Sequence, residues 1–298
     1  MDDAARPTRL RVKWNGISYL LVASVVWGIN WSLIKFLLSE LPPLSARAIA
    51  GVIGAAVAIG FATMRGETLI PPINRLPRLL IAAALNYTAW VALTAVSLIW
   101  LRASEAVIIS YTLPIWTAML ARPLLGERLT FARGFGMALG LSGVILLVFV
   151  QPEGGRGWTT LLGAALALSG SVLFALGAVL SKLTPLLMPP VAAVGWQIGL
   201  GTVPLLLAMF VEQPSFAAID VRGWLALTAS GVLALGLGYI AWFAALQRLP
   251  ASLVTIGSLL VPMIGVSSSG ILLGEPLGLR ECSALAITLI GVVIASRW

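Results

Sequence analysis

The sequence predicts an all-α polytopic membrane protein, with ten transmembrane helices arranged as two inverted five-helix repeats. Its composition is 59% hydrophobic and 10% charged, whereas soluble domains average about 45–50% and about 25%. Apolar runs of about 20 residues, long enough to cross ~30 Å of hydrocarbon, follow one another with short polar joins. Because backbone groups in lipid must be satisfied internally and alternating in-out patterning is absent, helices are the expected spanning elements.

The third observation is an internal duplication. Residues 97–146 match residues from 245 onward at a shift of 148, which places Pro114 on Pro262. Upstream, the match continues at a shift of 147 and pairs Lys35 with Lys182. Long self-similarity is a stronger indicator of fold than a single motif. Five spans are an odd number, so the second copy enters the membrane inverted, as in many alternating-access carriers. The two repeats are expected at 1–157 and 158–298.

Hydrophobic periodicity sets the expected helices in chain order, after a short basic N-terminal segment. The first repeat is expected to hold spans 16–38, 44–64, 79–98, 104–123 and 131–150. The second is expected to hold spans 160–182, 190–211, 223–246, 251–273 and 279–296.

The net charge is +8. The basic residues are distributed among the loops according to the side of the membrane, so the charge does not indicate a nucleic-acid-binding surface. With the N-terminus inside, thirteen of the 19 Lys and Arg residues fall on the cytoplasmic side. This bias predicts a plasma-membrane protein, of the bacterial inner membrane, with both termini cytoplasmic. Lys35 and Arg47 flank a turn near the outer face, where we expect their charged heads to snorkel to the interface. The single Cys282 excludes an internal disulfide, and the absence of histidine removes the commonest metal ligand and proton shuttle. No metal and no other cofactor is expected.

Polar and aromatic residues share faces of the first and third spans. Trp27 and Asn30 lie on one side of the first span. A mid-membrane amide needs a partner, so Asn30 either makes an interhelical hydrogen bond or faces a cavity. In the third span Asn86 and Trp90 are one turn apart with Tyr87 beside them. A place for Tyr87 in the interfacial aromatic belt remains an alternative.

A proline recurs inside the fourth and ninth spans. Because proline cannot donate to the carbonyl four residues earlier, Pro114 frees the carbonyl of Ser110, and Pro262 frees that of Ser258. Unpaired groups at this depth are tolerated where they line a cavity, which Tyr111 would share. The alternative is a simple kink whose carbonyl is satisfied by neighbouring helices.

The arrangement resembles the drug/metabolite transporter superfamily, specifically its EamA-type members with two five-helix repeats. The resemblance rests on Trp27–Asn30 through Lys35, and on both copies of the block from the inner proline through Leu-Gly-Glu to a late glycine. Within that family, Gly238–Trp242 followed by Gly257–Pro262 resembles the YddG-type amino-acid exporters. The resemblance implies a central cavity lined by spans 1, 3, 4, 6, 8 and 9, with 5 and 10 peripheral. Phe174 and Gly177 replace Trp27 and Asn30 in the second repeat, so the two halves should differ chemically.

These residues favour a secondary transporter that works by alternating access. Amide, hydroxyl and aromatic groups suit a zwitterion with an apolar side chain, so export of aromatic or neutral amino acids is expected. The proposed substrate contacts are Trp27, Asn30, Asn86, Tyr87, Trp90, Ser110, Tyr111, Tyr239, Trp242 and Ser258, with Pro114 and Pro262 breaking helices at the cavity.

The residues that the spans lack decide which energy source is expected for transport and which other functions are disfavoured. Glu105 lies near a helix end beside Arg102, as an ionised structural pair, so uncoupled movement down the substrate gradient is expected. The alternative is proton-coupled efflux of drug-like or quaternary-ammonium compounds. An enzyme is disfavoured because there is no histidine base, intramembrane carboxylate pair or His-Glu-x-x-His motif. The expected partners are a small-molecule substrate and the lipid bilayer, with no nucleic acid and no obligatory protein partner.

Overall fold

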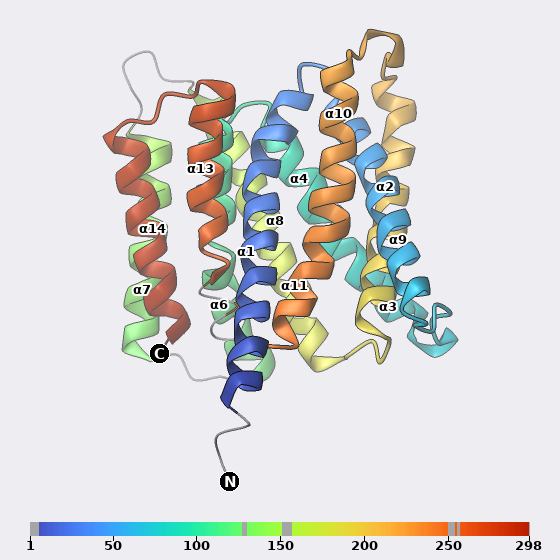
Figure 1. The fold of residues 1–298 in the computed structure, drawn as a ribbon. Coiled ribbons are helices and arrows are strands. Elements are labelled where there is room, and N and C mark those ends of the chain that lie inside the picture. The colour runs from blue at the N-terminus through green and yellow to red at the C-terminus, as the bar shows by residue number, and fades with distance from the viewer. Residues whose placement is uncertain (1–5, 127–129, 151–156, 250–253, 255–256, 298) are drawn as a thin grey trace.

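The computed structural model describes residues 6–126, 130–150, 157–249, 254 and 257–297, and within them it is a bundle of helices without strands (Figure 1). The first half holds α1 (Arg6–Leu37), α2 (Pro43–Met64), α3 (Leu76–Ala83), η2 (Ala84–Ala89), α4 (Trp90–Ser97), α5 (Ala103–Ser110), α6 (Leu113–Leu125) and α7 (Phe131–Phe149). The second half holds α8 (Trp158–Leu183), α9 (Pro190–Glu212), α10 (Val221–Ala229), η4 (Ser230–Leu237), α11 (Gly238–Leu246), α13 (Leu260–Leu273) and α14 (Leu279–Arg297). Short 3₁₀ turns lie at Ile73–Arg75 and Phe216–Ala218.

Where consecutive helices join into one continuous run, most of the runs are long enough for a bilayer. By length and composition, eight helical segments among the described residues can cross a membrane, and Leu260–Leu273 is a shorter apolar helix. The expected ninth span begins at 251–253 and 255–256, which lie outside the described residues. The expected all-helical membrane architecture is therefore confirmed, and α1 begins at the same end of the bundle at which α14 ends (Figure 1).

The third and eighth predicted spans each contain a π-helical turn at a corresponding place. Ala84–Ala89 interrupts α3 and α4, and Ser230–Leu237 interrupts α10 and α11. A π-turn takes in an extra residue. At 3.6 residues per turn, this rotates the preceding residues by about 100° relative to a continuous α-helix. The faces read from α-helical spacing are therefore wrong on one side of each π-turn.

The fourth and ninth predicted spans break at the recurring prolines. α5 ends at Ser110 and α6 begins at Leu113, so Pro114 lies in the first turn of α6. Likewise, α13 begins at Leu260 just before Pro262. Proline is tolerated in a first turn because the N–H it lacks has no intrahelical acceptor there.

The carbonyls at these breaks are not left unpaired. The Ser110 carbonyl accepts a hydrogen bond from the hydroxyl of Ser171 on α8 (2.9 Å). The Ser258 carbonyl accepts from the backbone N–H of Val261 (3.0 Å). The expectation of free carbonyls lining a cavity is therefore wrong, and the alternative of a kink satisfied by its neighbours holds.

Two peripheral helix pairs flank the bundle. α7 and α14 pack side by side at one edge, and α2 and α9 pack at the other (Figure 1). In the first pair, a Cβ added to Gly291 would lie only 2.2 Å from the backbone nitrogen of Gly140. Small residues thus allow these two backbones to approach closely.

The α2–α9 pair is fastened by reciprocal caps. Glu67, just after α2, accepts from the N–H of Ala192 in the first turn of α9 (2.9 Å). Glu212, at the end of α9, accepts from the N–H groups of Leu44 and Ser45 in the first turn of α2 (3.1 and 2.7 Å). Carboxylates satisfy the unpaired N–H groups and the positive dipole end of a helix. The exchange relates the two halves in the way expected of inverted copies.

Candidate functional site

A cavity of about 240 Å³ lies between the two peripheral pairs. It is bounded by α1, α2, α4, the α5–α6 break, α8, η4, α11 and the turn at Ser258, whereas no described residue of α7 or α14 lines it. Spans 1, 3, 4, 6, 8 and 9 thus contribute, as the resemblance implied, together with α2, which was not expected. The lining residues are Trp27, Asn30, Trp31, Ile34, Arg47, Trp90, Val91, Thr94, Ser110, Tyr111, Leu113, Phe174, Leu235, Tyr239, Trp242 and Ser258.

Aromatic rings line this cavity in two groups, and within each group the rings contact one another. Trp27 contacts Tyr239 in an edge arrangement and Trp242 in a tilted one, each with 5.3 Å between ring centroids. On the other side, Trp90 lies 5.2 Å from Phe174. Edge and tilted pairs are the favoured geometries of aromatic rings and fix one another's orientation. The aromatic parts of the lining therefore fix one another's orientation before any ligand binds.

Trp27 is held in place by the π-turn of the second half. Its indole N–H donates to the carbonyl of Ala234 in η4 (2.9 Å). A buried indole N–H normally needs such a partner. The π-turn therefore positions a cavity wall in addition to changing the helix register.

Asn30 makes an interhelical hydrogen bond and also lines the cavity. Its side-chain oxygen accepts from the hydroxyl of Ser230 (2.7 Å). That hydroxyl in turn accepts from Arg47 on α2 (2.9 Å). Both readings left open for Asn30 therefore hold together, and a polar chain crosses from α2 to α1.

Arg47 does not snorkel to the interface. It is 3% exposed, and its guanidinium reaches inward to Ser230 and lines the cavity. Hydropathy placed Arg47 one turn inside the outer end of α2, but it could not show that this face of α2 packs against η4. Arg47 is the one charged residue among the described residues that line this cavity, and sequence reasoning missed it.

Eight of the ten predicted substrate contacts line the cavity, and Asn86 and Tyr87 do not. The Asn86 amide instead donates to Gln197 on α9 (3.1 Å), and Tyr87 is buried at 1% exposure in a cluster with α9 side chains. Both residues belong to the π-turn, which rotates them away from the face of Trp90. The expectation that these two residues face the cavity is therefore wrong, because it assumed α-helical spacing. The burial of Tyr87 also excludes the alternative of an interfacial belt for this residue.

The two halves of the cavity differ chemically. Gly177 occupies the position that Asn30 has in the first repeat, and a Cβ there would lie 1.8 Å from the amide oxygen of Asn86. Gly177 therefore makes room for Asn86, which packs against α8. Phe174 replaces Trp27 and faces the cavity without a donor.

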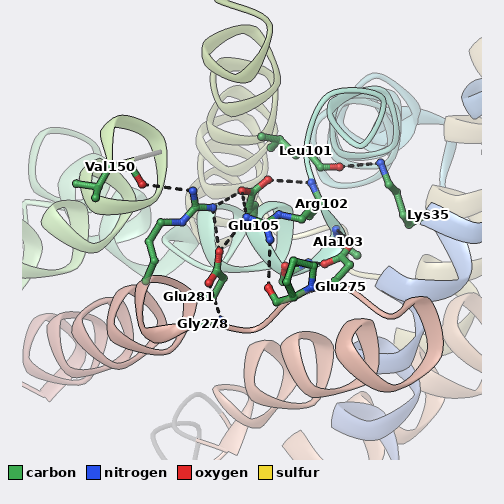
Figure 2. A network of polar contacts seen from close by, with 12 residues as sticks. Lys35, Leu101, Arg102, Ala103, Glu105, Val150, Glu275, Gly278 and Glu281 are labelled. Atoms are coloured by element: carbon green, nitrogen blue, oxygen red, sulfur yellow. Dashed lines mark hydrogen bonds and ion pairs between the residues drawn. The ribbon is translucent and has the colours of Figure 1, made fainter. Parts of the chain in front are cut away.

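A second polar feature is an ion-pair cluster, drawn in Figure 2. It includes the first turn of α14, at the end of the bundle opposite the chain termini (Figure 1). Arg102 pairs with Glu105 and Glu281 (3.0 and 2.9 Å), and Arg280 pairs with the same two carboxylates. Burial alone lowers the pKa of Arg102, but the neighbouring carboxylates raise it above its ordinary value. The expected pairing of Glu105 with Arg102 is thus present, within a larger buried network of balanced charge.

Two further charged residues join helices at this end. Glu275 accepts from the N–H groups of Ala103 and Ser104 in the first turn of α5 (2.6 and 3.0 Å; Figure 2). The Lys35 ammonium donates to the carbonyls of Leu98 and Leu101 after α4. Lys35 therefore meets the negative end of a helix dipole rather than only the interface. Among the described residues, no group of three or more Cys, Asp or Glu side chains is placed to hold a metal ion.

Comparison with known proteins identifies the family. The EamA-like transporter family matches residues 14–149 and again residues 161–297. The chain belongs to this family. As an EamA-like protein with membrane-spanning helices, it is an integral membrane transporter.

Relatives match over nearly the whole chain. The uncharacterized transporter YvbV of Bacillus subtilis is 29% identical over 91% of this chain and 88% of its own length. A probable amino-acid metabolite efflux pump of Escherichia coli is 29% identical over 92% of both chains. A probable terminal-alkyne amino-acid exporter of Streptantibioticus cattleyicolor is 28% identical over 82% of this chain and 80% of its own. One solved crystal structure, 20% identical, shares the fold with a TM-score of 0.69 over 96% of this chain and 98% of its own.

Proposed function

We propose that this EamA-like protein exports small neutral or aromatic amino acids by alternating access. The observation that carries the proposal is the aromatic cavity, because it lies where both repeats meet, clear of the peripheral α7–α14 pair. A pocket with apolar walls and a few placed polar groups orients one ligand while burying its side chain. Rings such as Trp27 and Tyr239 can contact an ammonium group, which contributes about 0.5–2 kcal/mol.

Size and charge favour an amino acid over a drug-like cation. The volume of about 240 Å³ lies below the roughly 300–1,000 Å³ of drug-sized ligand pockets. The charged side chain in the lining is the cation Arg47, which would repel a quaternary ammonium group. Relatives named as an amino-acid metabolite efflux pump and an amino-acid exporter add support.

The proposed topology is ten spans in two inverted repeats, in the plasma membrane with both termini cytoplasmic. The reciprocal caps between α2 and α9 and the two matched π-turns support it. In this topology the ion-pair cluster lies at the outer end of the bundle, opposite the cytoplasmic termini.

The topology is tested by labelling in intact cells. Cys282 is exposed and lies at the outer end, so the background should be Cys282→Ser. In that background, Gly154→Cys should react with an impermeant thiol reagent added outside, whereas Asn74→Cys, at the opposite end, should react only after lysis. The reverse pattern would exclude this orientation.

We further propose that transport is uncoupled. Glu105 is paired with two arginines at the end of the bundle, away from the cavity lining. A proton carrier has to be reached by both ligand and solvent, and Glu105 has no such access to the ligand. Substrate would therefore move down its own gradient.

Flux in proteoliposomes tests the transport proposal directly. Vesicles containing only this protein should exchange labelled phenylalanine or leucine in counterflow, at the same rate with or without an imposed pH gradient. Trp90→Ala protein, inserted to the same level, is the control. Absence of amino-acid flux would overturn the proposed substrate class, and uphill accumulation driven by the pH gradient would overturn the uncoupled mechanism.

A further inference from the structure

We propose that the Arg47 guanidinium binds the carboxylate of the transported solute, and so restricts this carrier to substrates with a free acid group. The inference rests on the proposed carrier function and adds its recognition chemistry. It starts from an imbalance inside the protein: a permanent positive charge faces an apolar cavity.

The first argument is the burial of an unbalanced charge. Arg47 is 3% exposed, and within the described part of the chain no carboxylate lies within ion-pair distance of it. A buried charge is costly unless it is paired. Ionisable groups inside membrane bundles therefore indicate a functional site by default. The missing counter-charge has to come from a group that enters the cavity.

The second argument is the hydrogen-bonding capacity that the protein leaves unused. A guanidinium has five N–H donors in a fixed fork. Here one of its nitrogens donates to Ser230, while the Nε atom is buried without a partner. An arginine fork matches a carboxylate in a bidentate pair. The hydroxyl of Ser110, on the cavity lining, is also buried without a partner.

The third argument is that the protein holds Arg47 in position without neutralising it. Ser230 accepts from Arg47 and donates to the Asn30 amide oxygen. These partners are neutral, so they fix the orientation of the guanidinium and keep its charge available. This arrangement is typical of a side chain that is held ready to bind a ligand. It differs from a structural ion pair, in which the charge is already neutralised by the protein.

The fourth argument comes from the duplication, which offers an internal control. In the second repeat, at the shift of 147, Val194 stands at the position of Arg47 and Gly177 at that of Asn30. Val194 is buried at 5% exposure in an apolar cluster. The equivalent helix thus packs without a cation, so the fold does not require Arg47 at this position.

The test compares acids with matched compounds that lack the acid group. The probes are L-phenylalanine, L-phenylalaninamide, phenethylamine and 3-phenylpropionate, with the corresponding leucine series. Binding is followed as ligand-dependent thermal stabilisation of the purified protein, which reports affinity without requiring transport. Wild-type protein should bind the acids at least about tenfold more tightly than the amides and amines, as expected for loss of a charged hydrogen bond.

Variants then assign the preference to Arg47. Arg47→Met should remove the preference for acids, and Arg47→Lys, which keeps the charge but not the fork, should retain part of it. Arg65→Met removes an exposed arginine from the far end of the same helix and should leave the preference unchanged. Because the wild-type panel needs no mutation, the proposal remains testable even if Arg47→Met is unstable.

The outcomes separate this inference from the proposed function. If wild-type protein binds acids and amides equally, or binds no acid in the panel, the role of Arg47 is overturned. If phenylalanine and its amide are transported equally by wild-type and Arg47→Met protein, the carrier function stands while this inference falls. If 3-phenylpropionate is transported in an Arg47-dependent way and amino acids are not, the inference stands while the amino-acid proposal falls.

Discussion

Replacing Ser171 with alanine tests whether the broken fourth span depends on one hydroxyl from the other repeat. The Ser171 hydroxyl donates to the Ser110 carbonyl, which Pro114 deprives of its helical donor (2.9 Å). Ser171→Ala leaves that carbonyl buried and without a partner. Because Ser171 does not line the cavity, the substitution addresses the helix break rather than substrate contact.

The expected cost follows from two limits. Leaving a buried acceptor unsatisfied costs about 1–3 kcal/mol, whereas interhelical hydrogen bonds in membrane proteins average about 0.6 and reach about 1.7 kcal/mol. The same hydroxyl lies 3.0 Å from the carbonyl of Ala167 within its own helix, which divides its single proton between two acceptors. We therefore expect Ser171→Ala to lower the free energy of unfolding by about 1 kcal/mol.

The chain supplies a matched control at the equivalent serine. Ser24 approaches the carbonyl of Gly257 at 3.4 Å, which is too long for a strong hydrogen bond. In thermal unfolding of purified protein, Ser171→Ala should lower the melting temperature by about 2 °C, at about 2 °C per kcal/mol for a chain of this size. Ser24→Ala should lower it by less. Equal melting temperatures for the two variants would refute the argument that Ser171 satisfies the break.

Three further predictions concern packing, the cavity and the ion-pair cluster. Gly291→Ala should destabilise the α7–α14 pair by about 1–3 kcal/mol, because the added Cβ would meet backbone atoms. Gly134→Ala is the control, since its Cβ would face open space, and it should leave the melting temperature measured by thermal unfolding unchanged. Trp90→Ala and Tyr239→Ala should insert normally but lose flux in proteoliposomes, and full flux in both would place the site outside the cavity. Glu105→Gln should lower the melting temperature, because it leaves buried arginine charge unbalanced. Flux should be insensitive to a pH gradient in both wild-type and Glu105→Gln protein. If wild-type protein instead accumulated substrate with the gradient and the variant did not, Glu105 would be a proton carrier.

The sequence contained enough information for the architecture and most of the cavity. Composition, apolar run length and duplication fix the helices, because lipid leaves the backbone few alternatives. Trp27 and Trp90 were found because aromatic side chains recur at helical spacing on otherwise apolar faces. The recurrence of Pro114 at position 262 located the helix breaks, although their carbonyls proved to be satisfied.

The remaining errors have two physical causes. Asn86 and Tyr87 were misplaced because no sequence signal marked the π-turn at Ala84–Ala89, and one extra residue in a turn is enough to move a side chain to another helix face. Arg47 was misplaced because a long side chain near a helix end can extend outward to the interface or inward to a cavity. Hydropathy alone does not distinguish these directions.

Comparison of the two copies with each other helps to decide whether a charged side chain near a helix end serves the scaffold or the cavity, which hydropathy does not show. The features that build the scaffold occur twice: the π-turns, the prolines and the carboxylate caps of α2 and α9. At the cavity, Ser110 has a counterpart in Ser258, whereas Arg47 and Asn30 correspond to Val194 and Gly177 and so occur once. A duplicated fold requires its scaffold in both halves, but a single substrate needs only one group for its acid. Positions that are charged in one copy and apolar in the other are therefore where a duplicated carrier should be searched for its binding residues. The criterion selects Arg47, opposite Val194, but also Glu105, opposite Leu253. The structure separates the two, because Arg47 lines the cavity whereas Glu105 is paired with two arginines at the end of the bundle.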